Sequence, residues 1–140
     1  MTHEITNRKA NDFDISETLE AGIILVGREI KSVAKKEVDL TGARCVLRND
    51  LLLVNAFIKK EVEDYFSVPF EPNRDRVLLV RKSELRFLRE RLKKGFYAIP
   101  IKMYLKKSKY KVMIGVGKPV LKGDKRQKEI DKQVRKEMYD

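Results

Sequence analysis

The sequence predicts a mainly β (α+β) fold: a small antiparallel barrel with two flanking helices and a basic C-terminal tail. Three observations support this prediction: short apolar segments separated by turn-forming residues, two amphipathic stretches of helical period, and a final charged stretch with few apolar residues. The length of 140 residues fits one domain. We expect the barrel to span residues 1–117 and the tail, disordered or marginally helical, to span residues 118–140.

The first part of the chain predicts strand followed by helix. Residues 12–26 alternate weakly between polar and apolar and end in an apolar run, which indicates one or two strands with a bend. In residues 28–36 the apolar side chains recur at spacings of three and four. We therefore expect a short helix that buries Ile30, Val33 and Ala34.

A β-hairpin and a loop are expected next. Residues 45–47 and 51–58 are rich in apolar side chains and flank Arg48-Asn49-Asp50, where Asn and Asp tolerate the backbone of a tight turn. Residues 59–75 contain two prolines that break any regular period, which predicts a mobile loop.

The second helix is expected to be basic outside and apolar inside. It follows a short apolar strand at residues 77–80, with Ser83 as its candidate N-cap and Gly95 as its stop. Leucines at helical spacing form its buried stripe, and arginines and lysines dominate the remaining faces.

A second hairpin is expected to present a basic and aromatic face. It joins residues 96–105 to residues 109–116 around Lys106-Lys107-Ser108. Because side chains alternate along a strand, Lys102 and Tyr104 share a face with Lys106, opposite Ile101, Met103 and Leu105.

Regular structure is expected to end after this hairpin, at Gly117 and Pro119. Beyond them, Ile130, Val134 and Met138 form one narrow apolar stripe, so a helix there is marginal on its own. Short strands in hairpins with two interposed helices favour a barrel of the oligonucleotide-binding (OB-like) type.

Positive charge is concentrated in one segment. The chain has 32 basic and 21 acidic residues, net +11, and residues 74–111 alone contain 14 basic and 3 acidic residues. Such an excess binds phosphates by releasing counterions, so nucleic acid is the expected partner. A solubilising face, an acidic membrane surface and an acidic protein are the alternatives.

Composition excludes several classes. No apolar stretch reaches the roughly 18 residues of a membrane span, and residues 1–10 lack the apolar centre of a secretion signal, so we expect a soluble, cytoplasmic protein that binds no membrane. Cys45 is the only cysteine and His3 the only histidine. An intramolecular disulfide, a Cys/His zinc site and a Ser-His hydrolase are thereby excluded, and we expect no metal or cofactor.

Seven short strings resemble, in order and approximate spacing, the SsrA-binding protein family, also called small protein B. The resemblance covers nearly the whole chain. The strings are Asn7-Arg8-Lys9-Ala10, Glu17-Thr18-Leu19-Glu20-Ala21-Gly22-Ile23, Gly27-Arg28-Glu29-Ile30-Lys31-Ser32, Asn55-Ala56-Phe57-Ile58, Arg74-Asp75-Arg76-Val77-Leu78-Leu79, Lys111-Val112-Met113-Ile114-Gly115-Val116 and Asp124-Lys125-Arg126.

The resemblance implies a bacterial RNA-binding protein that catalyses no covalent step. Its OB-like barrel would bind the tRNA-like domain of transfer-messenger RNA (SsrA). The complex would be delivered with elongation factor Tu to ribosomes stalled on broken messages, the process called trans-translation. The basic tail would fold into a helix in the empty message channel, against 16S rRNA, and we expect the protein to be a monomer.

Candidate RNA contacts follow from the matched strings and the basic hairpin. Glu20 favours RNA only where it accepts a hydrogen bond from a base amino group or a 2′-OH, and the family uses the matching glutamate for RNA contact. The alternative for Glu20 is a surface salt bridge or a turn acceptor, and Asn7 has either base edges or the barrel's own backbone as partners. The remaining candidates are phosphate contacts or, for tyrosine, base stacking: Arg8, Lys9, Arg74, Arg76, Lys102, Tyr104, Lys106, Lys107, Lys109 and Lys111.

The string Asp124-Lys125-Arg126 resembles the family string placed at the ribosomal decoding centre. The chain departs from the family elsewhere: Asn11-Asp12-Phe13 stands where a His-Asp-aromatic string is usual, Gly42-Ala43-Arg44 replaces Asp-Ser-Tyr, and the tail is several residues shorter than usual. We expect RNA binding to survive these changes more readily than full activity on the ribosome.

Three other functions compete with this reading. A generic ribosomal or single-strand RNA-binding protein of OB type is the main alternative. A nuclease with a metal held by Glu61, Glu63, Asp64 and Glu71, and an adaptor that docks its tail helix in a partner's groove, are weaker alternatives.

Overall fold

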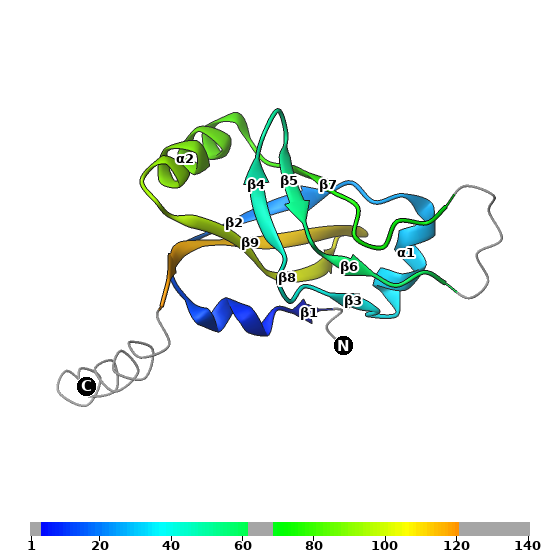
Figure 1. The fold of residues 1–140 in the computed structure, drawn as a ribbon. Helices are drawn as coiled ribbons and strands as arrows, with labels where there is room; N and C mark the ends of the chain where they lie inside the picture. The colour runs from blue at the N-terminus through cyan, green and yellow to red at the C-terminus, as the bar shows by residue number, and fades with distance from the viewer. Residues whose placement is uncertain (1–3, 62–68, 121–140) are drawn as a thin grey trace.

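A computed structural model describes residues 4–61 and 69–120 (Figure 1). Its main sheet comprises β1 (Ile5–Thr6), β2 (Phe13–Ile23), β4 (Arg44–Leu47), β5 (Leu51–Val54), β7 (Arg76–Leu79), β8 (Tyr97–Lys106) and β9 (Lys109–Pro119). The strand order is β1-β8-β4-β5-β7-β2-β9, and β8 also pairs with β9, so that the sheet closes into an antiparallel ring with β1 added beside β8. The predicted small OB-like barrel is confirmed.

Three long strands, β2, β9 and β8, run side by side and carry most of the candidate site. Their register aligns Ala21 with Val112 and Val112 with Met103, and these three side chains are fully buried in the core. The neighbouring rows of side chains point to the outside of the barrel because the pleat alternates. Figure 1 shows these strands crossing the middle of the molecule between α1 (Gly27–Ala34) and α2 (Lys82–Lys93).

The first predicted hairpin is confirmed, with its second strand in two parts. Arg48, Asn49 and Asp50 form the turn between β4 and β5. Asn55 has a left-handed backbone (φ +62°), which ends β5 before the short strand β6 (Phe57–Ile58). β6 leaves the main sheet to pair with β3 (Val38–Asp39).

Helix α1 forms where predicted, but it buries a different face. Val33 is buried as expected, together with Glu29 and Ser32, whereas Ile30 is 45% exposed and Ala34 lies at the surface. The expectation that Ile30 and Ala34 are core residues is therefore wrong. The helix turns its charged residue inward because a buried arginine is there to receive the Glu29 carboxylate.

Helix α2 begins one residue earlier than predicted, so Ser83 is not its N-cap. The Glu84 carboxylate accepts a hydrogen bond from the Arg81 N–H (2.9 Å), which satisfies one of the backbone donors exposed at the helix start. Leu88 is fully buried, and Gly95 ends the helix with a left-handed backbone (φ +89°), as predicted.

The second hairpin forms around a two-residue turn in which Lys107 (φ +50°) and Ser108 (φ +66°) are both left-handed. β9 then continues to Pro119, so regular structure extends past the predicted stop at Gly117. A Cβ at Gly117 would lie 2.2 Å from the Asp14 backbone oxygen, so this glycine permits close approach of β2 and β9 instead of ending a strand.

The N-terminal part adds the 3₁₀ helix η1 (Arg8–Asp12), which packs between β1 and β2. Part of the predicted loop at 59–75, residues 62–68, lies outside the described residues. Within residues 4–61 and 69–120, no helix is long and apolar enough to cross a membrane.

Candidate nucleic-acid interface

The Glu20 carboxylate is the centre of a polar cluster on the outer face of β2 and β8. It accepts a hydrogen bond from the Tyr104 hydroxyl and two from the Lys106 ammonium, at 3.2 and 3.3 Å. The side chain of Glu20 is 32% exposed, so an external donor can still reach it. A carboxylate offers about four acceptor positions, and three are in use, which leaves room for one more hydrogen bond.

These contacts keep Glu20 ionised. The hydrogen bond from Tyr104, together with the Lys106 ammonium, lowers the pKa of Glu20 below its ordinary value. Desolvation, followed by the hydrogen bond to Glu20, raises the pKa of Tyr104, so its hydroxyl remains a donor. Glu20 is therefore an acceptor-only group, held in a fixed orientation beside cations.

Lys102 and Tyr104 extend this cluster as predicted for one face of the hairpin. The Lys102 ammonium donates to Glu4 (3.1 Å) and lies 5.3 Å from the centre of the Tyr104 ring, a cation–π distance. The opposite side chain Met103 is fully buried. One face of Tyr104 is thus occupied by Lys102, and base stacking on this ring has to use the other face.

The hairpin tip presents lysines to solvent. Lys106, Lys107 and Lys109 are exposed, and Lys111 is half-buried two residues further along β9. All four come from one turn and its two flanking strand ends, so they lie together and are not spread around the barrel. Such a group attracts phosphate without reading sequence.

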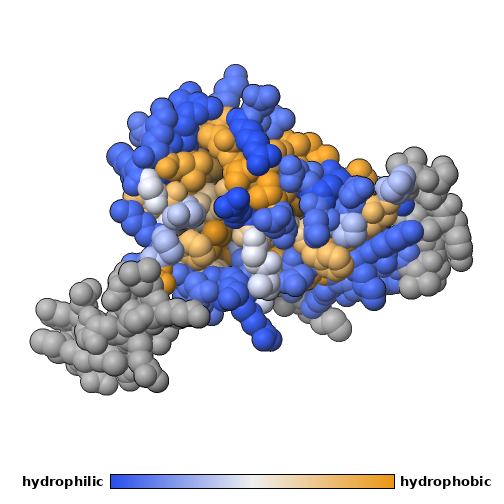
Figure 2. Space-filling view, in the orientation of Figure 1, coloured by the Kyte–Doolittle hydropathy of each residue, from blue (hydrophilic) through white to orange (hydrophobic). Residues whose placement is uncertain are grey.

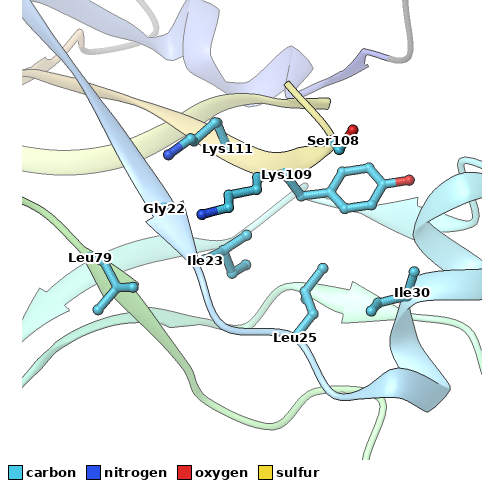
Figure 3. A pocket seen from close by; sticks show the side chains of 9 residues that line it. Gly22, Ile23, Leu25, Ile30, Leu79, Ser108, Lys109 and Lys111 are labelled. Atoms are coloured by element: carbon cyan, nitrogen blue, oxygen red, sulfur yellow. The ribbon is translucent and has the colours of Figure 1, made fainter. Parts of the chain in front are cut away.

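An apolar groove of about 370 Å³ lies beside this tip (Figure 3). Its apolar lining comes from β2, the segment after it, α1 and β7, and its polar rim comes from the hairpin. In Figure 3, Lys109 and Lys111 project along the groove, with Leu79 and Ile30 on its far sides. The lining residues are Gly22, Ile23, Leu25, Ile30, Leu79, Ser108, Lys109, Tyr110 and Lys111.

The sequence interpretation missed the apolar part of this groove. Leu79 is 55% exposed and Ile30 is 45% exposed, although both were assigned to buried segments. A signal was available for Leu79: residues 77–80 are all apolar, whereas a strand with one buried face needs apolar side chains only at alternate positions. Glu20 and Gly22 lie two residues apart on one face of β2, so the groove and the polar cluster are continuous.

Asn7 is a buried support for the N-terminal segment. Its side-chain amide donates to the Pro100 carbonyl (2.7 Å), and its side-chain oxygen accepts from the Lys9 N–H (3.1 Å). Of the two partners that the sequence left open for Asn7, the structure shows the barrel's own backbone. The exposed Arg8 and Lys9 follow directly and are positioned by this anchor.

Arg76 does not belong to the exposed cations, which corrects the prediction that it contacts phosphate. Its guanidinium is 0% exposed and donates to Glu29 (2.7 Å), to the Ala56 carbonyl (2.8 Å) and to the Pro72 carbonyl (3.0 Å). Arg74 is one-third exposed and also holds Glu29, at 2.7 Å and 3.1 Å. Burial and this pairing make Arg76 a structural residue.

The remaining candidate residues Asp124, Lys125 and Arg126 lie outside the described residues. Within residues 4–61 and 69–120, no group of three or more His, Cys, Asp or Glu side chains is placed to hold a metal ion.

Fold and surface together define a class: a small OB-like barrel with a basic, aromatic outer face around one ordered glutamate. The family model described as SmpB protein matches residues 4–140. The chain therefore belongs to the SmpB family, also named the SsrA-binding proteins.

Relatives in two groups of bacteria agree with this assignment. An SsrA-binding protein of Prochlorococcus marinus (strain MIT 9215) is 40% identical over 137 residues, covering 94% of this chain and 82% of the relative. An SsrA-binding protein of Staphylococcus carnosus (strain TM300) is 38% identical over 134 residues, covering 94% and 86%. A solved structure titled "tmRNA-SmpB: a journey to the center of the bacterial ribosome" matches with a TM-score of 0.70 and 33% identity, covering 89% of this chain and 92% of that one.

Proposed function

We propose that this protein binds the tRNA-like domain of transfer-messenger RNA and delivers it to stalled ribosomes in trans-translation. Family membership supports this function, as does the match to a structure whose title places SmpB with tmRNA in the bacterial ribosome. The observation that carries the proposal is the Glu20 cluster: an ionised, oriented acceptor beside a lysine-rich hairpin and an apolar groove.

The parts of this surface contribute differently to binding. The lysines at 106, 107, 109 and 111 supply affinity for phosphate, which any RNA satisfies. Glu20 repels phosphate, so it contributes only where the bound RNA places a base amino group or a 2′-OH against it. A hydrogen bond to a charged group is worth about 1.5–3 kcal/mol, which corresponds to roughly ten- to a hundredfold in affinity.

The groove suits an unstacked nucleotide. Its apolar walls, which include Leu79 and Ile30, cover a base or ribose face, while Lys109 and Lys111 reach the adjoining phosphates. A folded RNA that splays a nucleotide at this point gains contacts that a regular tRNA surface does not. This geometry makes shape, and not length or charge of the RNA, the basis of selection.

A gel-shift titration with the tRNA-like domain of transfer-messenger RNA against excess ordinary tRNA tests the proposal. We expect at least tenfold tighter binding of the tRNA-like domain at physiological salt, because Glu20 and the groove add to a charge term that both RNAs share. Equal affinity for both RNAs contradicts the proposal. It favours instead the second candidate, a generic ribosomal or single-strand RNA-binding protein using the same lysines.

The tail serves a separate step in this proposal. We assign RNA binding to the barrel and ribosomal engagement to residues 118–140, with Asp124, Lys125 and Arg126 at the 16S rRNA of the decoding centre and the rest in the message channel. Deleting residues 124–140 is expected to leave affinity for the tRNA-like domain within a few fold and to abolish tagging in a reconstituted stalled-ribosome assay. Full tagging by the truncated protein contradicts this division.

Other parts of the proposal follow from this role. The protein acts as a monomer in the cytoplasm, where ribosomes translate, meets elongation factor Tu through the shared RNA, and performs no covalent chemistry. Incubating the purified protein with labelled RNA and magnesium checks the last point, and we expect the RNA to remain intact.

A further inference from the structure

Four cations form one exposed stripe along α2, which we call the α2 stripe: Lys82, Arg86, Arg89 and Lys93. Their spacings of four, three and four residues place them on one side of the helix, over a length of about 17 Å. All four are exposed, and the buried Leu88 lies on the opposite side of the helix. In Figure 2 the outer side of α2, at upper left, is covered by hydrophilic side chains.

The charge of the α2 stripe is not neutralised within residues 4–61 and 69–120. None of the four cations has a salt bridge there, whereas Lys106 pairs with Glu20 and Lys102 pairs with Glu4 in the polar cluster. The acid Glu84 is occupied with the helix N-terminus. Arg91 of the same helix points inward to Glu17 (3.0 Å) and stands apart from the stripe. The least compensated row of positive charge therefore lies on α2.

The stripe is separate from the Glu20 cluster. Glu17, which holds Arg91, and Glu20 differ by an odd number of positions on β2, so their side chains leave opposite faces of the strand. α2 packs against β8 near one end of the barrel, and Figure 1 shows it on the opposite side of the molecule from α1, which borders the groove. An RNA held at the groove leaves the outer side of α2 uncovered.

We infer that the α2 stripe is a second phosphate-binding surface, which takes the backbone of a double-helical RNA segment without reading its bases. A straight row of Lys and Arg matches backbone contacts, which carry no sequence information. Phe87, the aromatic residue of α2, is half-buried beneath Arg91 (4.9 Å), so the stripe offers no stacking platform for single strands. The exposed side also lacks the apolar residues that a membrane-binding helix inserts. This inference goes beyond the proposed function and stands without it.

Neutralising the stripe tests the inference. The variant combines Lys82→Gln, Arg86→Gln, Arg89→Gln and Lys93→Gln, because glutamine is a good helix former and the four sites are exposed. The matched control removes the same charge near α1, at Lys31, Lys36, Lys59 and Lys60, also by glutamine. Circular dichroism melts verify that both variants fold.

The probe is a labelled RNA duplex of about 20 base pairs and arbitrary sequence, titrated by fluorescence anisotropy between about 50 and 200 mM salt. Each lost phosphate contact lowers the slope of log affinity against log salt by about 0.9 on B-form DNA, and we expect a comparable value on duplex RNA. The stripe variant should lose at least tenfold in affinity and about 3 in slope, and the control variant less than threefold in affinity. Equal effects of the two variants overturn the inference.

A bridging assay separates this inference from the proposed function. The tRNA-like domain is immobilised, protein is added, and capture of the labelled duplex is measured. Wild-type protein should capture the duplex, and the stripe variant should bind the immobilised RNA but capture no duplex. Displacement of protein from the immobilised RNA by the duplex shows a single shared site and overturns the inference, as does a stripe that prefers polyglutamate to the duplex. Weak binding of the immobilised RNA by wild-type protein bears on the proposed function alone.

Discussion

Replacing Arg76 by methionine tests whether this arginine holds the fold together or contacts RNA. The side chain is fully buried, and its three donor nitrogens bind the Glu29 carboxylate and the carbonyls of Ala56 and Pro72. Through these contacts it joins α1, the end of the first hairpin and β7. Methionine fills a similar volume but supplies no donor.

The magnitude follows from what the substitution leaves behind. Two carbonyls lose their side-chain donor, and Glu29 keeps only Arg74 and the Val26 N–H (3.0 Å). Removing one partner of a buried ion pair costs about 3–5 kcal/mol. Because Arg74 still binds Glu29, we expect the lower end, about 3 kcal/mol, which lowers the melting temperature by roughly 10 °C in a domain of this size.

Thermal and urea unfolding followed by circular dichroism measure this effect. Arg74→Met is the matched control: Arg74 is one-third exposed, so its loss should cost about 1 kcal/mol. At a temperature where both variants remain folded, Arg76→Met should bind the tRNA-like domain within twofold of wild type. An unchanged melting temperature together with a large loss of RNA affinity refutes the structural role.

Three further predictions concern stability. Burial by itself raises the pKa of Glu29, but hydrogen bonds from Arg74, the Val26 N–H and Arg76 outweigh it and lower the pKa below its ordinary 4.5. Stability should therefore be complete above about pH 4.5 and decline as the pH falls through the lowered value, with a smaller decline in Glu29→Gln, as urea titrations at several pH values will show. Gly117→Ala should destabilise by at least about 3 kcal/mol, because its Cβ meets the Asp14 backbone at 2.2 Å, and Gly115→Ala by less, because its Cβ meets the movable Ile101 side chain at 2.7 Å; equal unfolding midpoints contradict this ranking. Ser108→Gly should raise the unfolding free energy by about 0.5–1 kcal/mol, since glycine adopts the observed φ of +66° without strain, and a lowered midpoint contradicts that reasoning.

Local pattern was enough to predict most of the barrel. Both hairpins, both helices and the strand at residues 77–80 form where turn residues and apolar period place them. The shared face of Lys102, Tyr104 and Lys106 also followed from alternation alone, and the structure adds Glu20 to it from a strand more than 80 residues away in sequence. Contacts of that range depend on sheet order, which periodicity does not contain.

The failures have a common physical cause, because the sequence shows residue type and not burial. Glu29 and Arg76 are charged and were expected at the surface, yet each is buried by pairing with the other. Leu79 and Ile30 are apolar and were expected in the core, yet they line an open groove. Such exchanges between core and surface are characteristic of sites that serve a partner, and are visible only when both members are placed in space.

Discrimination by Glu20 is the claim on which the functional account depends most. The most direct measurement is the ratio of dissociation constants for ordinary tRNA and the tRNA-like domain, determined for wild type, Glu20→Gln and the control Glu17→Gln. Glu17 lies on the same strand with similar exposure and one salt bridge. We expect the ratio to fall about tenfold in Glu20→Gln, with tRNA binding unchanged or tighter, and to stay within twofold in Glu17→Gln. A ratio that is unchanged in Glu20→Gln contradicts the account.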